Sequence, residues 1–134
     1  MTPTRQTIFA PGTGDCWAAC IAAVLDLPLS EVPNFCGVPP YNPDWFAQTD
    51  AWLQQRGLRC VSFEMKVQDG NTPVNISCPN GAPLLCTGKS PRGDWLHVVV
   101  MTVKGEEFAL LNDPHPSGIG LDGPFTDVAL IVKA

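Results

Sequence analysis

The sequence has no cluster of lysine or arginine residues. Its eight basic residues are outnumbered by 13 acidic residues, and the formal net charge is −5. Proteins that grip nucleic acid without regard to sequence need a concentrated basic surface, because phosphate contacts supply most of that binding. We therefore expect no nucleic-acid ligand.

Long hydrophobic runs are missing as well. No segment has the length of a transmembrane helix, and no signal-peptide core follows Met1. We therefore expect no membrane association and a cytoplasmic location. The sequence leaves the oligomeric state open.

The six cysteines have no Cys-X-X-Cys spacing, which is the main sequence sign of a structural zinc site. They are Cys16, Cys20, Cys36, Cys60, Cys78 and Cys86. Without a secretory signal, a chain of this size is expected to keep its thiols reduced. We expect no metal and no cofactor.

The chain does have enough apolar material for one core. Hydrophobic residues make up 45% of its 134 positions, so residues 1–134 are expected to form a single folded domain. The 14 prolines and 12 glycines predict many turns and short regular elements.

Two helices are predicted in the first half. The first is expected over residues 16–26, because Leu27 precedes Pro28 and the residue before proline avoids helical geometry. A single turn is expected at residues 30–32. The second helix is predicted between a cap at Asn42 and a stop at Gly57, with Pro43 in its first position. Its apolar stripe, which we expect in the core, consists of Trp45, Thr49, Trp52 and Leu53.

After Leu58 the hydrophobic period changes to two, which is typical of strands. Strands are predicted over residues 59–65, 84–87, 95–103, 107–111 and 128–132, and residues 68–83 are rich in turn formers. Helices followed by strands predict an α+β fold, with N-terminal helices packed on a mostly antiparallel sheet.

Cys16 is the first candidate for chemistry. A glycine-rich approach leads to Asp15, a residue type that caps helices, and would place Cys16 at the first helical position. Free amides and the positive end of the helix dipole favour a thiolate there, and the thiolate is the reactive form. Packing alone is the simpler explanation for a cysteine in an alanine-rich helix, and Cys20 fits that explanation well.

His97 and Asp113 are the second and third candidates. His97 lies in an apolar strand, where an imidazole needs hydrogen-bonding partners. Asp113 ends the next strand, and a hairpin would bring both residues to the same end of the sheet. A carboxylate could then orient the imidazole and leave one nitrogen for a nucleophile. His115 remains a rival base, and Asn112 a rival orienter.

These residues carry a resemblance to a known family. A Cys-Trp pair opening a helix, then a strand histidine, then an acid on the following strand resembles the papain-like cysteine peptidase superfamily. Gly-Asp-Cys with a downstream His and Asp-Pro is especially similar to compact bacterial peptidases that trim leader peptides at double-glycine sites. The wider pattern also resembles small uncharacterised proteins of phages and bacteria.

The resemblance implies a papain-like fold and a role for each residue. Cys16 would be the nucleophile, His97 the general base and acid, and Asp113 the orienter of the imidazole. Gln6 would donate to the oxyanion together with the Cys16 amide. In the family this glutamine lies closer to the cysteine, so the loop at residues 11–14 would have to fold back; Thr13 and Asn34 are alternative donors.

The chemistry implied is thiol-dependent acyl transfer on an amide or peptide bond, with a peptide, a protein or another amide as substrate. Peptidases, isopeptidases and amidases share its steps. A non-catalytic papain-fold binding protein, such as a phage inhibitor of a host protein, is the alternative. A redox pair formed by Cys16 and Cys20 is a third reading, for which helical i, i+4 geometry is poor.

Overall fold

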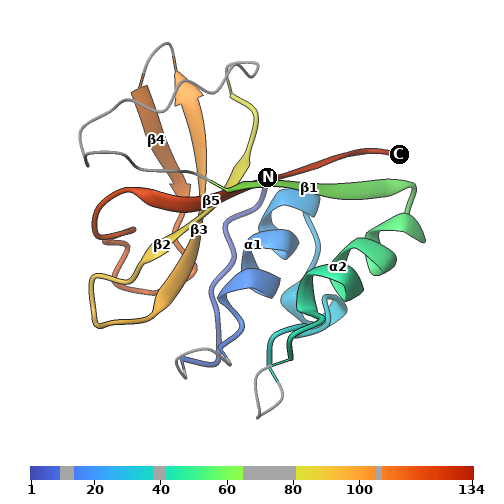
Figure 1. Ribbon diagram of the computed structural model, residues 1–134, viewed down its shortest axis with the longest axis horizontal. Coiled ribbons are helices and arrows are strands. Elements are labelled where there is room, and N and C mark those ends of the chain that lie inside the picture. Colours follow the sequence, from blue (N-terminus) through green and yellow to red (C-terminus); the bar gives the residue numbers. More distant parts are fainter. Residues whose placement is uncertain (10–13, 38–41, 65–80, 105–106) are drawn as a thin grey trace.

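In the described residues, two short helices precede a five-stranded antiparallel sheet, which confirms the predicted α+β class (Figure 1). The computed structural model describes residues 1–9, 14–37, 42–64, 81–104 and 107–134. The elements are α1 (Cys16–Leu25), the 3₁₀ turn η1 (Leu29–Glu31), α2 (Trp45–Gln54), β1 (Leu58–Glu64), β2 (Leu84–Lys89), β3 (Leu96–Lys104), β4 (Glu107–Asn112) and β5 (Phe125–Lys133). Most of the turn-rich region at residues 68–83 lies outside the described residues.

The strands are arranged in the order β1-β5-β2-β3-β4. The predicted hairpin is present, because β3 pairs with β4 from Lys104↔Glu107 to Val100↔Asn112. The C-terminal strand β5 lies in the interior of the sheet, between β1 and β2. The last segment of the chain therefore connects the first strand to the rest of the sheet.

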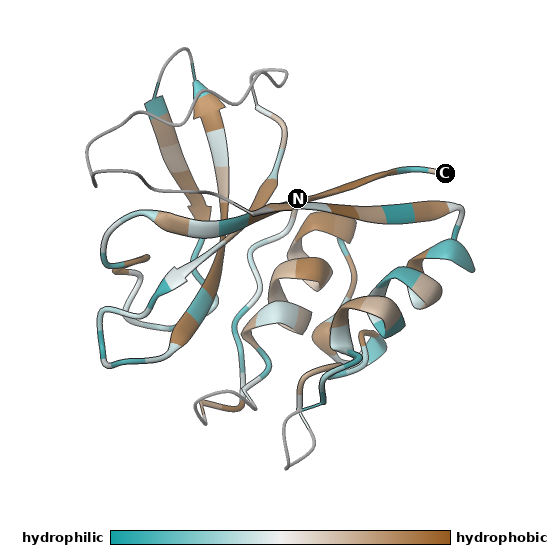
Figure 2. Ribbon diagram, viewed as in Figure 1, coloured by the Kyte–Doolittle hydropathy of each residue, from teal (hydrophilic) through white to brown (hydrophobic). Residues whose placement is uncertain are grey.

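Both helices lie on the same side of the sheet, with α1 against β3 and α2 along β1 (Figure 1). Every residue of α1 from Trp17 to Ala23 is buried, and its ribbon is apolar on nearly all sides (Figure 2). Small alanine side chains let α1 approach β3 closely. Its first turn is thereby held at one end of that strand.

The opposite face of the sheet carries a second apolar cluster. Its buried members are Leu84, Cys86, Val99, Val103 and Val128. Strand β3 therefore packs on both faces, with Val98 and Val100 facing the helices and Val99 facing this cluster. This explains its unbroken apolar run. No helix in the described ranges is long and apolar enough to cross a membrane.

The helix ends differ slightly from the prediction. Helix α1 ends at Leu25, where Asp26 takes a left-handed conformation with a φ of 56°. Helix α2 begins at Trp45 rather than Pro43, because the Asn42 side chain accepts a hydrogen bond from the Asp44 amide (3.1 Å) and forms a turn before the helix.

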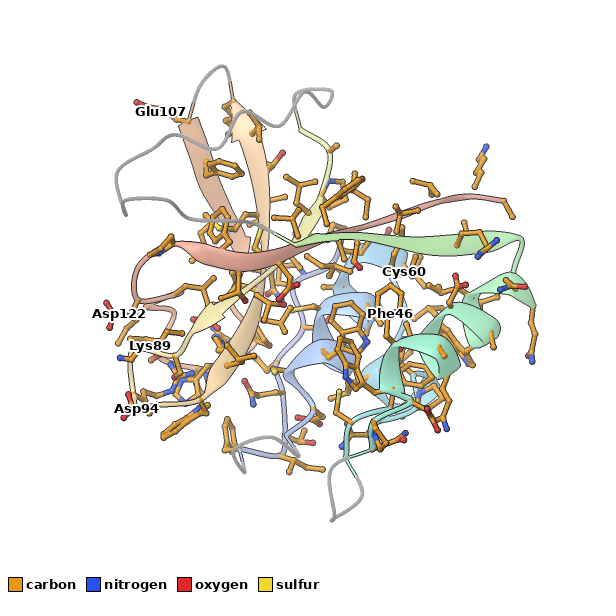
Figure 3. The ribbon with its side chains drawn as sticks, viewed as in Figure 1. Phe46, Cys60, Lys89, Asp94, Glu107 and Asp122 are labelled. Carbon is orange, nitrogen blue, oxygen red and sulfur yellow. The ribbon has the colours of Figure 1, made fainter. Side chains whose placement is uncertain are left out.

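The apolar side of α2 packs towards β1, and Phe46 and Cys60 belong to the same core cluster (Figure 3). Thr49 and Leu53 are fully buried, as the predicted stripe requires. Trp45 is only half-buried, and one side of its ring is open to a cleft. Trp45 therefore packs against the core cluster, as predicted, and also lines a cleft.

Candidate active site

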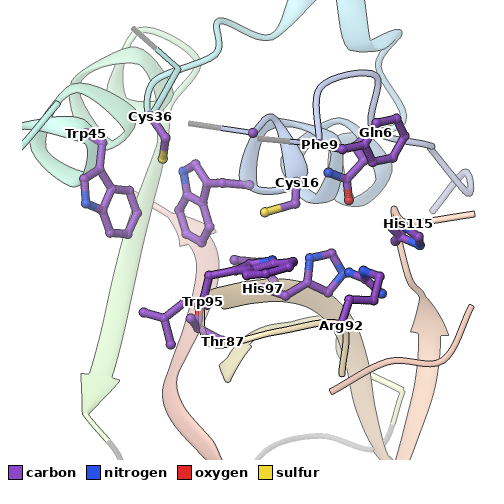
Figure 4. A pocket seen from close by; sticks show the side chains of 14 residues that line it. Gln6, Phe9, Cys16, Cys36, Trp45, Thr87, Arg92, Trp95, His97 and His115 are labelled. Atoms are coloured by element: carbon purple, nitrogen blue, oxygen red, sulfur yellow. The ribbon is translucent and has the colours of Figure 1, made fainter. Parts of the chain in front are cut away.

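A cleft of about 480 Å³ lies between the start of α1 and the start of β3 (Figure 4). Gln6, Cys16 and His97 all contribute to its lining. Asp113 lies directly behind His97, with its carboxylate oxygen 2.7 Å from the imidazole. The structure thus brings the four predicted site residues together from the N-terminal arm, α1, β3 and the end of β4.

Cys16 is the first residue of α1 and is half-buried at the cleft. The helical hydrogen bonds begin with the Ala19 amide, which donates to the Asp15 carbonyl at 2.9 Å. Amides earlier in the first turn, including that of Cys16, have no helical acceptor. They supply positive partial charge beside the Cys16 sulfur.

Cys20 lies one turn further along α1 and is completely buried. Its thiol donates to the Val98 carbonyl (S···O 3.4 Å), and burial raises the pKa of this thiol well above its usual value. Cys20 therefore packs in the core, as the simpler explanation predicted. Its burial argues against a redox pair with Cys16.

Asp15 does not cap α1 with its side chain, so this expectation was wrong. Its buried carboxylate accepts hydrogen bonds from the Thr7 amide (2.9 Å), the Thr7 hydroxyl (2.7 Å) and the Ile8 amide (2.9 Å). The N-terminal arm offers three donors at once, and these occupy the carboxylate. Asp15 consequently ties the arm to the start of α1.

This tie brings Gln6 to the cleft. The Asp15 amide donates to the Ile8 carbonyl (3.3 Å), so the two sides of the predicted fold-back lie together, although residues 10–13 are outside the described residues. The Gln6 backbone amide also donates to the Pro114 carbonyl at 2.9 Å. The arm is thus held by both the helix and the loop after Asp113.

The Gln6 side chain is 7% exposed and lies beside Cys16 (Figure 4). Its Nε2 donates one hydrogen bond to the Ile8 carbonyl at 2.9 Å, and its buried Oε1 has no partner among the described residues. Nε2 carries two hydrogens, so a second one remains for another acceptor.

His97 is 3% exposed, and its Nε2 is 2.7 Å from Asp113 Oδ1. Burial lowers the pKa of His97, but the hydrogen bond to Asp113 and the interaction with Cys16 outweigh it and raise this pKa to about 9. Because Nε2 is engaged by Asp113, Nδ1 is the nitrogen left for Cys16. The protonated imidazole places a positive charge beside the sulfur.

Asp113 is buried, and both of its oxygens are occupied. Oδ1 accepts from His97 and from the His115 amide (2.9 Å), and Oδ2 accepts from the Gly120 amide (2.8 Å). Burial raises the pKa of Asp113, but these three hydrogen bonds outweigh it and lower the value. The carboxylate therefore stays charged and keeps the imidazole in one orientation.

The rival orienter, Asn112, and the rival base, His115, are held by other hydrogen bonds. Asn112 is buried and exchanges hydrogen bonds with the Thr4 backbone: its side-chain oxygen accepts from the Thr4 amide (3.3 Å), and its Nδ2 donates to the Thr4 carbonyl (3.1 Å). His115 lines the cleft, but its Nδ1 accepts from the Ser117 amide (3.0 Å). Burial, followed by the charge of Arg92, lowers the pKa of His115.

The loop between β4 and β5 carries Asp113 and His115, and an ion pair holds its other end. Lys89 of β2 pairs with Asp122 (3.1 Å), and the Asp122 amide donates to the Lys89 carbonyl (2.9 Å) (Figure 3). The sequence analysis did not find this anchor. An exposed ion pair adds little stability, so its role is to fix where the loop runs.

Aromatic side chains form much of the cleft wall, which sequence reasoning also missed. They are Phe9, Trp17, Trp45 and Trp95. Trp45 packs edge-on against Trp17, with ring centroids 5.1 Å apart. Trp95 lies across Gly93, where an added Cβ would come within 2.0 Å of the ring. The Trp-Ala-Ala run after Cys16 and the Gly-Asp-Trp turn were the available signals.

The arrangement combines a thiol, an oriented imidazole and the first-turn amides of α1 in one cleft. No group of three His, Cys, Asp or Glu side chains in the described ranges is placed to hold a metal ion. Comparisons with models of protein families, with curated proteins and with solved structures found no match to this chain.

Proposed function

We propose that the protein is a thiol-dependent acyl-transfer enzyme with a papain-like fold, which acts on an amide or peptide bond. One observation carries the proposal: the Cys16 thiol, at the first turn of α1, shares a cleft with a His97 imidazole that a buried Asp113 holds through Nε2. These are the nucleophile, base and orienter that covalent catalysis requires.

In the first half of the reaction, His97 Nδ1 holds the proton of the Cys16 thiol, and the thiolate attacks the substrate carbonyl carbon. The C–S bond forms while the carbonyl π electrons move to oxygen. The Cys16 amide and the second Gln6 Nε2 hydrogen would donate to that oxyanion. When the intermediate collapses, the C–N bond breaks and His97 gives its proton to the leaving amine.

In the second half, water or another amine attacks the thioester, and His97 takes its proton. The C–S bond breaks, and the proton returns to the Cys16–His97 pair. With water the products are those of a peptidase, isopeptidase or amidase, and with an amine the reaction is a transamidation. We propose a peptide, a protein or another amide as substrate.

We place this activity in the cytoplasm. The five cysteines of the described part of the chain are all free. A reducing compartment would keep them in that state, and would also keep a catalytic thiol active.

Selective alkylation tests the proposal. Iodoacetamide near neutral pH should label Cys16 at least about tenfold faster than any other cysteine, because only a thiolate reacts rapidly. Burial raises the pKa of Cys36 to about 12, which makes this other cleft thiol the internal reference. Peptide mass spectrometry after timed quenching gives the rate for each site, and an electrophilic acyl probe should show the same selectivity.

Equal labelling of all cysteines, or faster labelling of Cys36, would contradict the proposal and favour a non-catalytic binding protein. A Cys16→Ser variant should lose labelling at this site and should keep its fold. Its circular dichroism spectrum and thermal midpoint would therefore match those of the wild type.

Replacing Gln6 by alanine should lower kcat by about a hundredfold, because an oxyanion donor acts as charge develops in the transition state. The free energy of unfolding should change by less than about 1 kcal/mol, since the change removes one hydrogen bond together with a buried oxygen that has no partner in the described part of the chain. Hydrolysis of a peptide identified by acyl-probe competition provides the rate.

Gln55→Ala is the matched control, because Gln55 is exposed at the end of α2. It should leave both kcat and stability unchanged. If Gln6→Ala kept the wild-type kcat, the oxyanion role would pass to another donor, while the roles of Cys16 and His97 would stand.

A further inference from the structure

One end of the cleft is positively charged. Arg92 and His115 both line it, next to His97 (Figure 4). Arg92 lies in the tight turn between β2 and β3, and its backbone amide donates to the Ser90 hydroxyl at 3.2 Å. Its guanidinium donates to the Ser117 hydroxyl, also at 3.2 Å. Hydrogen bonds therefore hold both the backbone and the guanidinium of Arg92.

No carboxylate neutralises Arg92 among the described residues. The side-chain ion pairs found there join Arg59 to Asp50, Lys89 to Asp94 and Asp122, and His97 to Asp113. The half-buried Arg92 guanidinium has five donor hydrogens and a permanent charge, and it donates one hydrogen bond to the Ser117 hydroxyl. The chain as a whole has a net charge of −5, so the positive charge of Arg92 is a local property of the cleft.

His115 adds a neutral donor to this cation. Its Nδ1 accepts from the Ser117 amide (3.0 Å), so the ring proton of the neutral form lies on Nε2. Burial and then the charge of Arg92 lower the pKa of His115, which keeps the ring neutral near pH 7. The Ser117 hydroxyl contacts both side chains, at 3.2 Å from Arg92 and 2.9 Å from His115 Nδ1, and fixes them relative to each other.

We propose that Arg92 and His115 form an anion subsite, which binds a carboxylate of the substrate close to the amide bond that is broken. The assignment rests on the proposed function, because it takes Cys16 as the reacting group. It narrows the substrate class to amides and peptides that carry a carboxylate beside the scissile bond. Arg92 supplies charge and directional donors, and the aromatic wall around Trp95 contacts the apolar part of the substrate.

A matched pair of alkylating agents tests the subsite. Iodoacetate and iodoacetamide transfer nearly identical groups to a thiolate, and only iodoacetate carries a carboxylate. In the wild type, the ratio of the alkylation rate with iodoacetate to the alkylation rate with iodoacetamide should therefore be high at Cys16. Arg92→Gln should lower this ratio about fivefold, since one favourable charge at short range is lost. Arg92→Lys keeps the charge and should retain most of the ratio.

Lys104→Gln is the charge-matched control, because Lys104 is an exposed cation at the far end of β3. It changes the net charge equally and should leave the ratio unchanged. An equal drop in both variants would assign the effect to net charge and overturn the subsite, as would an Arg92→Gln ratio equal to that of the wild type. If iodoacetamide failed to prefer Cys16 at all, the proposed function would fail instead.

Protection experiments distinguish two sources of the carboxylate. N-acetylphenylalanine carries a terminal carboxylate, the α-amide of N-acetylaspartate carries a side-chain one, and N-acetylphenylalaninamide carries none. We expect the terminal carboxylate to slow iodoacetamide alkylation of Cys16 most, and Arg92→Gln to remove that protection. Stronger protection by the aspartate compound would assign the subsite to a side-chain carboxylate. Equal effects of all three compounds would overturn the substrate assignment.

Discussion

Replacing His97 by alanine should lower turnover by about 10³-fold or more, because the proposed general base and acid is lost. The same change should slow iodoacetamide alkylation of Cys16 at least about tenfold near pH 7. His97 has a pKa raised to about 9, so it is protonated near pH 7 and places a positive charge beside the Cys16 sulfur. Steady-state hydrolysis and timed alkylation measure the two effects separately.

His115→Ala is the natural comparison, since His115 lines the same cleft and is the only other histidine. Its Nδ1 is occupied by Ser117, so it is not free to accept a proton from Cys16. The alkylation rate with neutral iodoacetamide should change less than about twofold. The opposite ranking of the two variants would transfer the role of base to His115.

Replacing Asp113 by alanine should lower the free energy of unfolding and change the pH dependence of both stability and kcat/KM. The change leaves His97 Nε2 and the amides of His115 and Gly120 without their acceptor. Losing one member of a buried, hydrogen-bonded pair costs about 3–5 kcal/mol of unfolding free energy. Urea unfolding at pH 7 gives this value.

The pH dependence follows from the pKa of His97. In the folded protein burial lowers it, but Asp113 and Cys16 raise it to about 9, above the ordinary value of 6.5. The pair therefore contributes stability that is fully present below pH 6.5 and is lost as the pH rises towards 9. Without Asp113 the pKa of His97 should fall, so stability should change less over this range and the alkaline limb of kcat/KM should move to lower pH.

Asn112→Ala is the matched control for Asp113→Ala. Asn112 is also buried at the end of β4, but its side chain holds the Thr4 backbone and does not contact the imidazole. It should cost about 1–3 kcal/mol of stability and should leave the alkaline limb where it is. An alkaline limb that moved in the Asn112 variant and not in the Asp113 variant would identify Asn112 as the orienter.

Local sequence signals predicted the secondary structure well, for reasons that act over a few residues. The proline rule located the end of α1 within one residue, and Gly57, with a φ of +71°, ends the turn after α2. The short turn between two apolar strands predicted the β3–β4 hairpin and, with it, the His97–Asp113 contact. Hairpin pairing is local, so it can be derived from spacing alone.

Residue types alone did not decide how Asp15 uses its carboxylate. A helix cap and a tie to the arm are both good uses of that group, and only the folded arm supplies three donors to it. The position of Gln6 depends on this same choice. Tertiary contacts therefore determined whether the proposed oxyanion donor reaches the cleft.

The sequence alone was sufficient for the α+β class, the element order and the closeness of His97 to Asp113. Tertiary structure decided that β5 lies inside the sheet, that Trp45 faces a cleft, and that Arg92 lies beside His115. The physical reason is the separation along the chain of the residues that interact. Helix ends and hairpins follow from neighbours along the chain, whereas the cleft is formed by the arm, α1, α2, the turn after β2 and the loop after β4, which meet only when the sheet and helices pack.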